Sequence, residues 1–253
     1  MSFRPFLVVL ILGLGLLPEQ GSAQNFKNEQ LRHVRVREAF ADKETVLKRF
    51  FETKGIQYPP RRILIRIFKE ERILELWVAN SDKDRFQLLK KYEICASSGE
   101  LGPKRQQGDG QVPEGFYHVT GFNPQSAFYL SLRIDYPNRS DSILGTRGRL
   151  GGDIFIHGSC VTIGCIPIED DKIKELYLMA VEARSAGQVN MPVHIFPVRL
   201  TEEGFRQLER DFAGRTDLLN FWKNLRMGFD YFEGQQKPPV VGVDSLGEYI
   251  FPN

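Results

Sequence analysis

The chain has 253 residues, of which 42% are hydrophobic and 26% are charged, a composition typical of a folded protein and not of a disordered one. Its 34 Lys and Arg residues nearly balance 32 Asp and Glu residues, which gives a formal net charge of +2. A balance this close to neutral argues against nucleic acid as a partner, because such proteins carry a marked basic excess or a basic stripe.

The N-terminus has the layout of a secretory signal peptide. Arg4 gives it a positive start, an apolar run extends from Phe6 to Leu17, and small residues precede a cleavage site that we place after Ala23. We therefore predict that residues 1–23 are removed and that the mature protein is periplasmic or secreted, without a membrane span. The alternative is an uncleaved anchor, because signal and anchor differ mainly in the length of the apolar run.

The next segments predict a helix followed by strands. Apolar positions predict a helix over residues 29–54, which Gly55 can end. Residues 63–68 and 74–78 alternate in the way of paired strands, with a charged turn between them. Further strands are predicted at 86–95, 116–119, 128–134, 153–156 and 193–198, and a long Gly- and Pro-containing loop at 97–113.

Helical periodicity returns in the second half of the chain. It begins after Pro167, where Ile173, Leu176, Tyr177 and Ala180 follow helical spacing. Two more helices are predicted near 202–212 and 217–227, followed by an irregular Gly- and Pro-rich tail at 228–253. The sum is a mainly β catalytic unit flanked by α-helices at both ends, α+β overall. We divide the chain into a signal peptide (1–23), an N-terminal helical extension (24–60), a catalytic domain (61–199) and a C-terminal helical extension with its tail (200–253).

The residues with the clearest chemistry lie in one stretch, from His157 to Pro167. A predicted strand ends at His157, and a predicted helix starts just after Cys165. A thiol at the start of a helix feels the positive end of the helix dipole, which lowers its pKa. A histidine eight residues away can return to it across a tight loop, and such a pair is the minimum for nucleophilic acyl transfer. The amides around Gly164 and Cys165 are candidates for an oxyanion hole.

Three other interpretations of this stretch remain open at the level of residue spacing. His157 can cap the end of the strand, Cys160 and Cys165 can form a small-loop disulfide, and His157 with the two cysteines can form part of a zinc site. Zinc needs three or four ligands, and the third cysteine, Cys95, is distant in sequence. We expect neither a metal nor another cofactor. Cys160 also suggests a reversible bridge to Cys165 that protects or inactivates the thiol.

The motif resembles a known signature. His157-Gly158-Ser159 followed by Thr162-Ile163-Gly164-Cys165 is similar to the His-Gly-Ser/Thr and Ser/Thr-x-Gly-Cys elements of L,D-transpeptidases of the YkuD type. Segments across most of the mature chain resemble the YafK branch of that family, namely 68–70, 74–78, 98–104, 108–117, 136–138 and 229–232.

The resemblance implies a β-rich catalytic fold and a cysteine nucleophile that acts on peptidoglycan stem peptides, in cell wall biogenesis or remodelling. Transfer of the acyl group to an amine, from another stem peptide or from an envelope lipoprotein, completes the reaction. Carried over by position, Cys165 is the nucleophile, His157 the general base and Thr162 a residue that orients the histidine. Gly164 and Cys165 hold the oxyanion. Gly158 and Ser159 are expected to contact substrate.

One departure from the family pattern bears on the reaction. The residue two after the cysteine is Pro167, where many L,D-transpeptidases have an arginine suited to a substrate carboxylate. This keeps two alternatives open: an amidase or hydrolase that uses the same site to cut stem peptides or release a protein from peptidoglycan, and a non-catalytic wall-binding protein with its cysteines locked in a disulfide. In place of the arginine, Lys104, Arg105, Arg147 and Arg149 are candidates for the anion contact, with a solvated surface charge as the alternative role for each.

Overall fold

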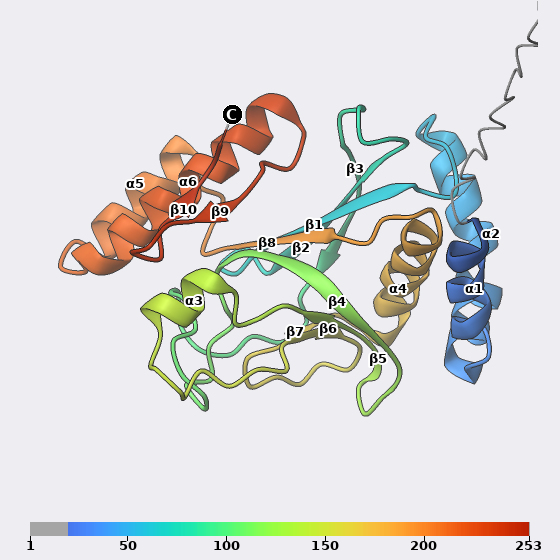
Figure 1. Ribbon diagram of the computed structural model, residues 1–253, viewed down its shortest axis with the longest axis horizontal. Helices are drawn as coiled ribbons and strands as arrows, with labels where there is room; N and C mark the ends of the chain where they lie inside the picture. Colours follow the sequence, from blue (N-terminus) through green and yellow to red (C-terminus); the bar gives the residue numbers. More distant parts are fainter. Residues whose placement is uncertain (1–19, 253) are drawn as a thin grey trace, which may run out of the picture.

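The computed structural model describes residues 20–252, with side chains from residue 25 onward. Most of the predicted signal peptide therefore lies outside the described residues. An eight-stranded sheet forms the centre of the molecule, in the order β3-β2-β1-β8-β4-β5-β6-β7. Helices α1, α2 and α4 lie to one side of it, and α5 and α6 lie to the other with a two-stranded β9–β10 pair (Figure 1). The fold is α+β with helices at both ends, as the sequence predicts.

The helices are α1 (Gln20–Gln30), α2 (Val34–Thr53), α3 (Arg139–Leu144), α4 (Asp170–Ser185), α5 (Glu202–Asp211) and α6 (Thr216–Gln235). The strands are β1 (Arg62–Phe68), β2 (Ile73–Ala79), β3 (Gln87–Glu93), β4 (Gly115–Ser126), β5 (Tyr129–Ile134), β6 (Phe155–His157), β7 (Ile166–Pro167), β8 (Met191–Phe196), β9 (Gly242–Val243) and β10 (Tyr249–Ile250).

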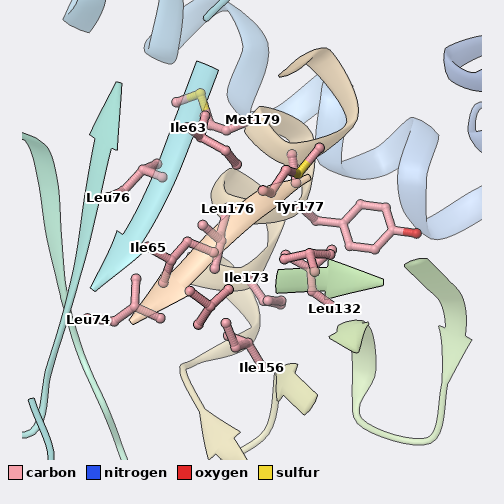
Figure 2. Packing of buried hydrophobic residues seen from close by; sticks show 14 of the residues in the cluster. Ile63, Ile65, Leu74, Leu76, Leu132, Ile156, Ile173, Leu176, Tyr177 and Met179 are labelled. Atoms are coloured by element: carbon pink, nitrogen blue, oxygen red, sulfur yellow. The ribbon is translucent and has the colours of Figure 1, made fainter. Parts of the chain in front are cut away.

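Strand β1 is covered on both faces, because successive side chains of a strand point to opposite sides. Ile63, Ile65 and Ile67 enter the main core with α2 and α4. The alternate residues Leu64 and Phe68 pack in two smaller clusters with residues of α6. Figure 2 shows the main core, where residues of α4 such as Leu176 and Met179 lie against isoleucines and leucines of β1, β2, β5 and β6. Helix α4 is thus fixed beside the strand that ends at His157.

The buried cation Arg66 ties α6 to the other face of β1. Its side chain is fully buried, its Nη1 donates to Glu233 at 2.7 Å, and its guanidinium lies 4.4 Å from the ring centre of Phe232. A buried guanidinium needs such partners, because transfer of an unpaired charge from water to the protein interior costs on the order of several kcal/mol. The C-terminal extension therefore packs on the sheet as part of one structure.

Two predicted boundaries are wrong. Helix α6 continues to Gln235, so the segment 228–235, predicted as irregular, is helical. Gly228 lies inside this helix. A glycine is needed there because the ring of Phe116 packs closely against the backbone: a Cβ at this position would lie 2.4 Å from that ring. The single helix predicted at 29–54 is two helices, with a break at residues 31–33 where Arg37 Nη1 donates to the carbonyl oxygens of Leu31 and Arg32.

Among the helices of residues 20–252, we find none with both the length and the apolar character needed to cross a membrane.

Candidate active site

The pairing of β6 with β7 brings His157 and Cys165 to the same face of the sheet. The two strands are parallel, with Ile156 opposite Ile166 and His157 opposite Pro167. Ile156 and Ile166 point into the core. By strand alternation His157 faces the other way, and we expect the same of Cys165, the residue directly before β7. Strand spacing and rise place their α-carbons about 8 Å apart, a gap that two side chains on one face can close.

A strand, and not a helix start, follows the cysteine. Ile166 and Pro167 extend along β6, and α4 begins only at Asp170. Proline is tolerated here because β7 is the edge strand of the sheet and needs no outward N–H donor. The expectation that Cys165 lies directly at a helix N-terminus is therefore wrong, and the helix dipole does not explain its reactivity.

His157 is held as a neutral base. Its side chain is 1% exposed, and its Nδ1 lies in hydrogen-bond contact with the carbonyl oxygen of Gly158. A carbonyl only accepts, so Nδ1 carries the proton and Nε2 is left with a lone pair. Burial lowers the pKa of His157, and the Gly158 carbonyl offsets part of this effect. The imidazole is thus uncharged at neutral pH and able to accept the thiol proton.

Gly158 is required by close packing beside the histidine. A Cβ at this position would lie 2.5 Å from Oδ1 of Asp170 and 2.9 Å from the carbonyl oxygen of Phe128. The same Asp170 oxygen accepts a hydrogen bond from the Ser159 amide at 2.7 Å. The first turn of α4 therefore fixes the backbone after His157. The structure gives Gly158 and Ser159 this scaffolding role, and their predicted substrate contacts stay predictions.

Cys165 is half-buried and outside any disulfide. Its Sγ lies 3.7 Å from the carbonyl oxygen of Asp153, the geometry of a weak S–H donor. Burial raises the pKa of the Cys165 thiol. The Asp153 carboxylate raises it further, while the Phe155 amide and the Lys104 ammonium act in the opposite direction. The low pKa expected from the sequence is therefore wrong, because these pKa shifts favour the neutral thiol of Cys165 and the neutral imidazole of His157.

Hydrogen bonds of Thr162 shape the loop that carries the cysteine. Its Oγ1 donates to the carbonyl oxygen of Cys165 at 2.8 Å and accepts from the Gly164 amide at 3.1 Å. Thr162 thus orients the backbone at Cys165, while the Gly158 carbonyl has the contact with His157. Because the Gly164 amide is already bonded, the Cys165 amide is the better candidate for the oxyanion.

A disulfide joins Cys95, just after β3, to Cys160 in the same loop. The Cys95 amide also donates to the carbonyl oxygen of Pro167 at 3.1 Å. The segment after β3 therefore holds residues 160–167, the loop that carries Cys165, at both of its ends. The proposed Cys160–Cys165 bridge is wrong, because Cys160 is already paired with Cys95. The same pairing removes Cys160 from a zinc site with His157 and Cys165.

Two of the four basic residues predicted as anion contacts are held by carboxylates. Lys104 is buried, and its Nζ donates to Asp109 at 2.5 Å. Arg105 Nη1 donates to Asp141 at 3.1 Å. Arg147 and Arg149 are exposed on the segment between α3 and β6. Lys104 is thus part of the loop framework, and the structure does not bring Arg147 to the thiol through any contact among the described residues.

The loop at 97–113 is anchored by a buried carboxylate. Glu114 is fully buried and accepts from Lys69 Nζ at 2.8 Å, from the Gly102 amide at 2.7 Å and from Trp222 Nε1 at 2.7 Å. Lys69 Nζ also donates to the carbonyl oxygens of Gly102 and Val112. The 97–113 loop packs against the loop that carries Cys165, since a Cβ on Gly164 would lie 3.0 Å from the carbonyl oxygen of Gln111. Glu114 therefore connects α6 to the wall of the site.

Residues 61–195 match the model of the YkuD family, described as the L,D-transpeptidase catalytic domain. The chain is also 38% identical over 190 residues to the L,D-transpeptidase homologue YafK of Escherichia coli (strain K12), which covers 74% of this chain and 73% of that protein. The chain belongs to the L,D-transpeptidase family. The same values hold for YafK of Escherichia coli O157:H7, and they confirm the resemblance to the YafK branch.

Two solved structures align with parts of the chain at low similarity. The helical cell shape determining protein Pgp2 from Campylobacter jejuni aligns with a TM-score of 0.44 and 16% identity, over 72% of this chain and 73% of that chain. Mycobacterium tuberculosis L,D-transpeptidase 1 aligns with a TM-score of 0.30 and 14% identity, over 53% and 61%. The family assignment depends on the sequence matches and not on these weaker structural ones.

Several residues of this L,D-transpeptidase-family site were not predicted. Phe128, Asp170 and Cys95 each contact the His157–Cys165 segment from a different element. The sequence offered only a partial signal for two of them. The odd number of cysteines indicated a free thiol without showing which one, and the acids after Pro167 suggested a helix start and not a bond to Ser159.

The neutral pair predicts a steep pH dependence of thiol alkylation. Iodoacetamide reacts with the thiolate, and the raised pKa of Cys165 keeps that form scarce at neutral pH. We expect the rate to rise about tenfold per pH unit from pH 6 to pH 8.5, without a plateau. Mass spectrometry of the labelled protein checks this, with Cys165→Ala as the unlabelled control. A plateau below pH 7 would show a preformed thiolate–imidazolium pair and contradict the expectation.

Proposed function

We propose that this L,D-transpeptidase-family protein is a cysteine-dependent acyl-transfer enzyme of the bacterial cell wall. Its substrates are peptidoglycan stem peptides, and its acceptor is an amine of another stem peptide or of an envelope lipoprotein. The observation that supports this best is that the parallel β6–β7 pair, within the matched catalytic domain, brings together the segments that carry a buried His157 and a Cys165 outside any disulfide.

The geometry suggests how the reaction proceeds. His157 Nε2 takes the thiol proton as Cys165 Sγ attacks the amide carbon next to diaminopimelate. The Cys165 amide stabilises the oxyanion of the tetrahedral intermediate. The C–N bond then breaks, D-alanine leaves with a proton from the imidazolium, and a thioester remains. An amine attacks the thioester, His157 accepts its proton, and release of the thiol restores the neutral pair. Each step uses groups of the chain and the substrate, without a cofactor.

Hydrolysis at the same site is the second candidate, and one observation favours it. Pro167 is buried in β7, and its carbonyl oxygen accepts from the Cys95 amide. The position where many relatives have a carboxylate-binding arginine is thus part of the sheet edge and offers no charge. Without that contact the acceptor peptide is less well held, and water is the competing acceptor. The site would then cut stem peptides or release a protein from peptidoglycan.

The wall-binding alternative requires that the thiols be locked in a disulfide. The Cys95–Cys160 bond meets this requirement for two cysteines, whereas Cys165 stays free. An unpaired thiol next to a base favours an enzyme over a binding module.

Export to an oxidising compartment is part of the proposal. The N-terminal apolar run predicts it, and a disulfide between residues 65 positions apart is typical of exported proteins and rare in the cytosol. We therefore place the mature protein in the periplasm or outside the cell.

Purified sacculi provide the test of the proposed reaction. The mature protein and its Cys165→Ala variant are incubated with them, and muropeptides are analysed by mass spectrometry. We expect wild type alone to release D-alanine, with a rate at least roughly 10³-fold above the variant, because loss of a nucleophile removes the covalent route. New cross-links or protein attachments identify transfer, whereas free diaminopimelate carboxylates identify hydrolysis.

The variant has an internal control for folding. Cys165→Ala keeps Cys95 and Cys160, so a folded variant shows no free thiol without reductant, while the folded wild type shows one. If wild type and variant are both folded and equally inactive on donor plus acceptor, the proposal of an enzyme fails and the wall-binding alternative is favoured.

A further inference from the structure

An aromatic ring covers the candidate base. The ring of Phe128 is stacked on His157, with centroids 4.6 Å apart and an angle of 28° between the ring planes. His157 is 1% exposed, whereas Phe128 is 39% exposed. The phenyl ring thus separates the imidazole from solvent on this side and restricts rotation of its plane. Burial of this kind is also what lowers the pKa of His157.

A tight turn determines the position of Phe128. It lies between β4 and β5, where Ser126 pairs with Tyr129 across a two-residue loop. The Phe128 amide donates to Ser126 Oγ at 3.1 Å, and Tyr129 adopts a left-handed φ of 71°. The hairpin is aligned with the histidine strand, because Ser131 of β5 is opposite His157. A change in the turn would therefore move the ring relative to the imidazole.

Arg35 of α2 clamps this turn from outside the matched catalytic domain. Its Nη1 donates to the carbonyl oxygen of Ser126 at 2.6 Å and to that of Tyr129 at 2.7 Å, the two residues that close the loop. Its guanidinium also lies 5.4 Å from the ring centre of Tyr129. Charge-assisted bonds of this type are roughly twice as strong as neutral ones. In Figure 1 the β4–β5 hairpin extends toward the N-terminal helices.

We propose that Arg35 and Phe128 are positioning residues for His157. Arg35 holds the turn at 126–129, the turn places Phe128, and Phe128 stacks on His157. Through these contacts the N-terminal helical extension supports the proposed base. The inference rests on the proposed function in one respect, the role of His157 as base. Neither residue contacts the reacting atoms. Their effect is to fix the plane of the imidazole and exclude water from it, so that Nε2 is held in one orientation for proton transfer.

The charged groups near the stack do not provide another explanation for a fixed imidazole. Asp170 of α4 directs Oδ1 to the Ser159 amide. Lys174, further along α4, is paired with Asp42 at 2.5 Å. The contact with the Gly158 carbonyl fixes one nitrogen of the ring but leaves its tilt free, and the Phe128 ring removes that freedom.

The experiment compares four variants of the full mature chain. Phe128→Leu removes the stack but keeps an apolar side chain, and Phe128→Tyr keeps the ring. Arg35→Met removes both bonds to the turn. Arg37→Met is the matched control, because Arg37 lies on the same helix and bonds only the exposed carbonyls of Leu31 and Arg32 among the described residues. Three quantities are measured: the pKa of His157 by NMR, assigned with His157→Gln, and kcat and KM for release of D-alanine.

We expect Phe128→Leu to raise the pKa of His157 toward its ordinary value and to lower kcat by roughly tenfold to a hundredfold, with KM changed less than about threefold. Phe128→Tyr should restore both values. Arg35→Met should change both in the same direction as Phe128→Leu by a smaller factor, and Arg37→Met should match wild type.

An unchanged pKa of His157 together with a kcat within about twofold of wild type in Phe128→Leu would overturn the proposal. Phe128 would then only occupy space beside His157, without an effect on the imidazole. The NMR titration needs no substrate. If wild type itself shows no turnover, the proposed function fails, while the titration still decides whether Phe128 and Arg35 position the imidazole.

Discussion

Removal of the Cys95–Cys160 disulfide is expected to lower the free energy of unfolding by about 4 kcal/mol. The bond joins residues separated by 65 positions, and a crosslink over a loop of that length restricts the unfolded chain strongly. The double variant Cys95→Ser/Cys160→Ser is the appropriate comparison, because it leaves Cys165 as the remaining cysteine of the chain. Urea unfolding of wild type and of the double variant measures the difference in the free energy of unfolding. Reductant should abolish this difference, because it breaks the disulfide of the wild type.

The same bond should also control the thiol of the active site. Cys160 and the Pro167 contact of Cys95 restrain the two ends of the loop that carries Cys165. In the single variant Cys95→Ser, Cys160 loses its partner and lies five residues from Cys165. We expect an incorrect Cys160–Cys165 bridge in oxidising buffer, with loss of activity that reductant reverses. The double variant cannot form this bridge and should keep the larger part of its activity.

Thiol counting distinguishes these states directly. Folded wild type should give one alkylated cysteine without reductant and three after reduction and unfolding. Cys95→Ser should give none in oxidising buffer, against one for the double variant. Equal activity of the single and double variants in oxidising buffer, each with free Cys165, would contradict the expectation and leave the disulfide with a purely structural role.

Substitution of Glu114 by alanine is expected to destabilise the protein by about 3–5 kcal/mol. The change leaves the Lys69 ammonium, which is 7% exposed at its side chain, without its carboxylate. It also leaves Trp222 Nε1 without the acceptor that it has at 2.7 Å. Unpaired buried donors carry the full cost of desolvation. Because the carboxylate also binds the Gly102 amide, the 97–113 loop should loosen and the Cys165 alkylation rate should change with it.

Urea denaturation gives the free energy of unfolding, and Glu209→Ala is the matched control. Glu209 is exposed near the end of α5, and its replacement should change the free energy by less than about 0.5 kcal/mol. The double variant Lys69→Met/Glu114→Leu should cost less than Glu114→Ala alone, because it removes the unpaired charge along with its partner. A Glu114→Ala protein as stable as the control would show that solvent reaches Lys69 in place of the carboxylate.

The sequence by itself determined the features that depend on nearby residues. Alternation in residues 63–68 identified β1 and both of its faces, because side-chain direction in a strand has a period of two. The spacing of apolar residues after Pro167 identified α4. The His157 to Cys165 motif was sufficient to predict the family, which the comparisons confirm. All of these signals are contained in short stretches of chain.

Only the tertiary structure decided which distant groups meet. Cys160 pairs with Cys95 and not with Cys165, because β3 ends beside the loop that carries Cys160 and Cys165. The pKa of Cys165 is raised, because the tertiary surroundings remove water from the thiol and place the Asp153 carboxylate near it. Position 228 inside α6 is a glycine, because Phe116 packs where the side chain of another residue would be. Phe128 lies on His157 because β5 pairs with β6. Each outcome depends on strand order and burial, which spacing along the chain does not contain.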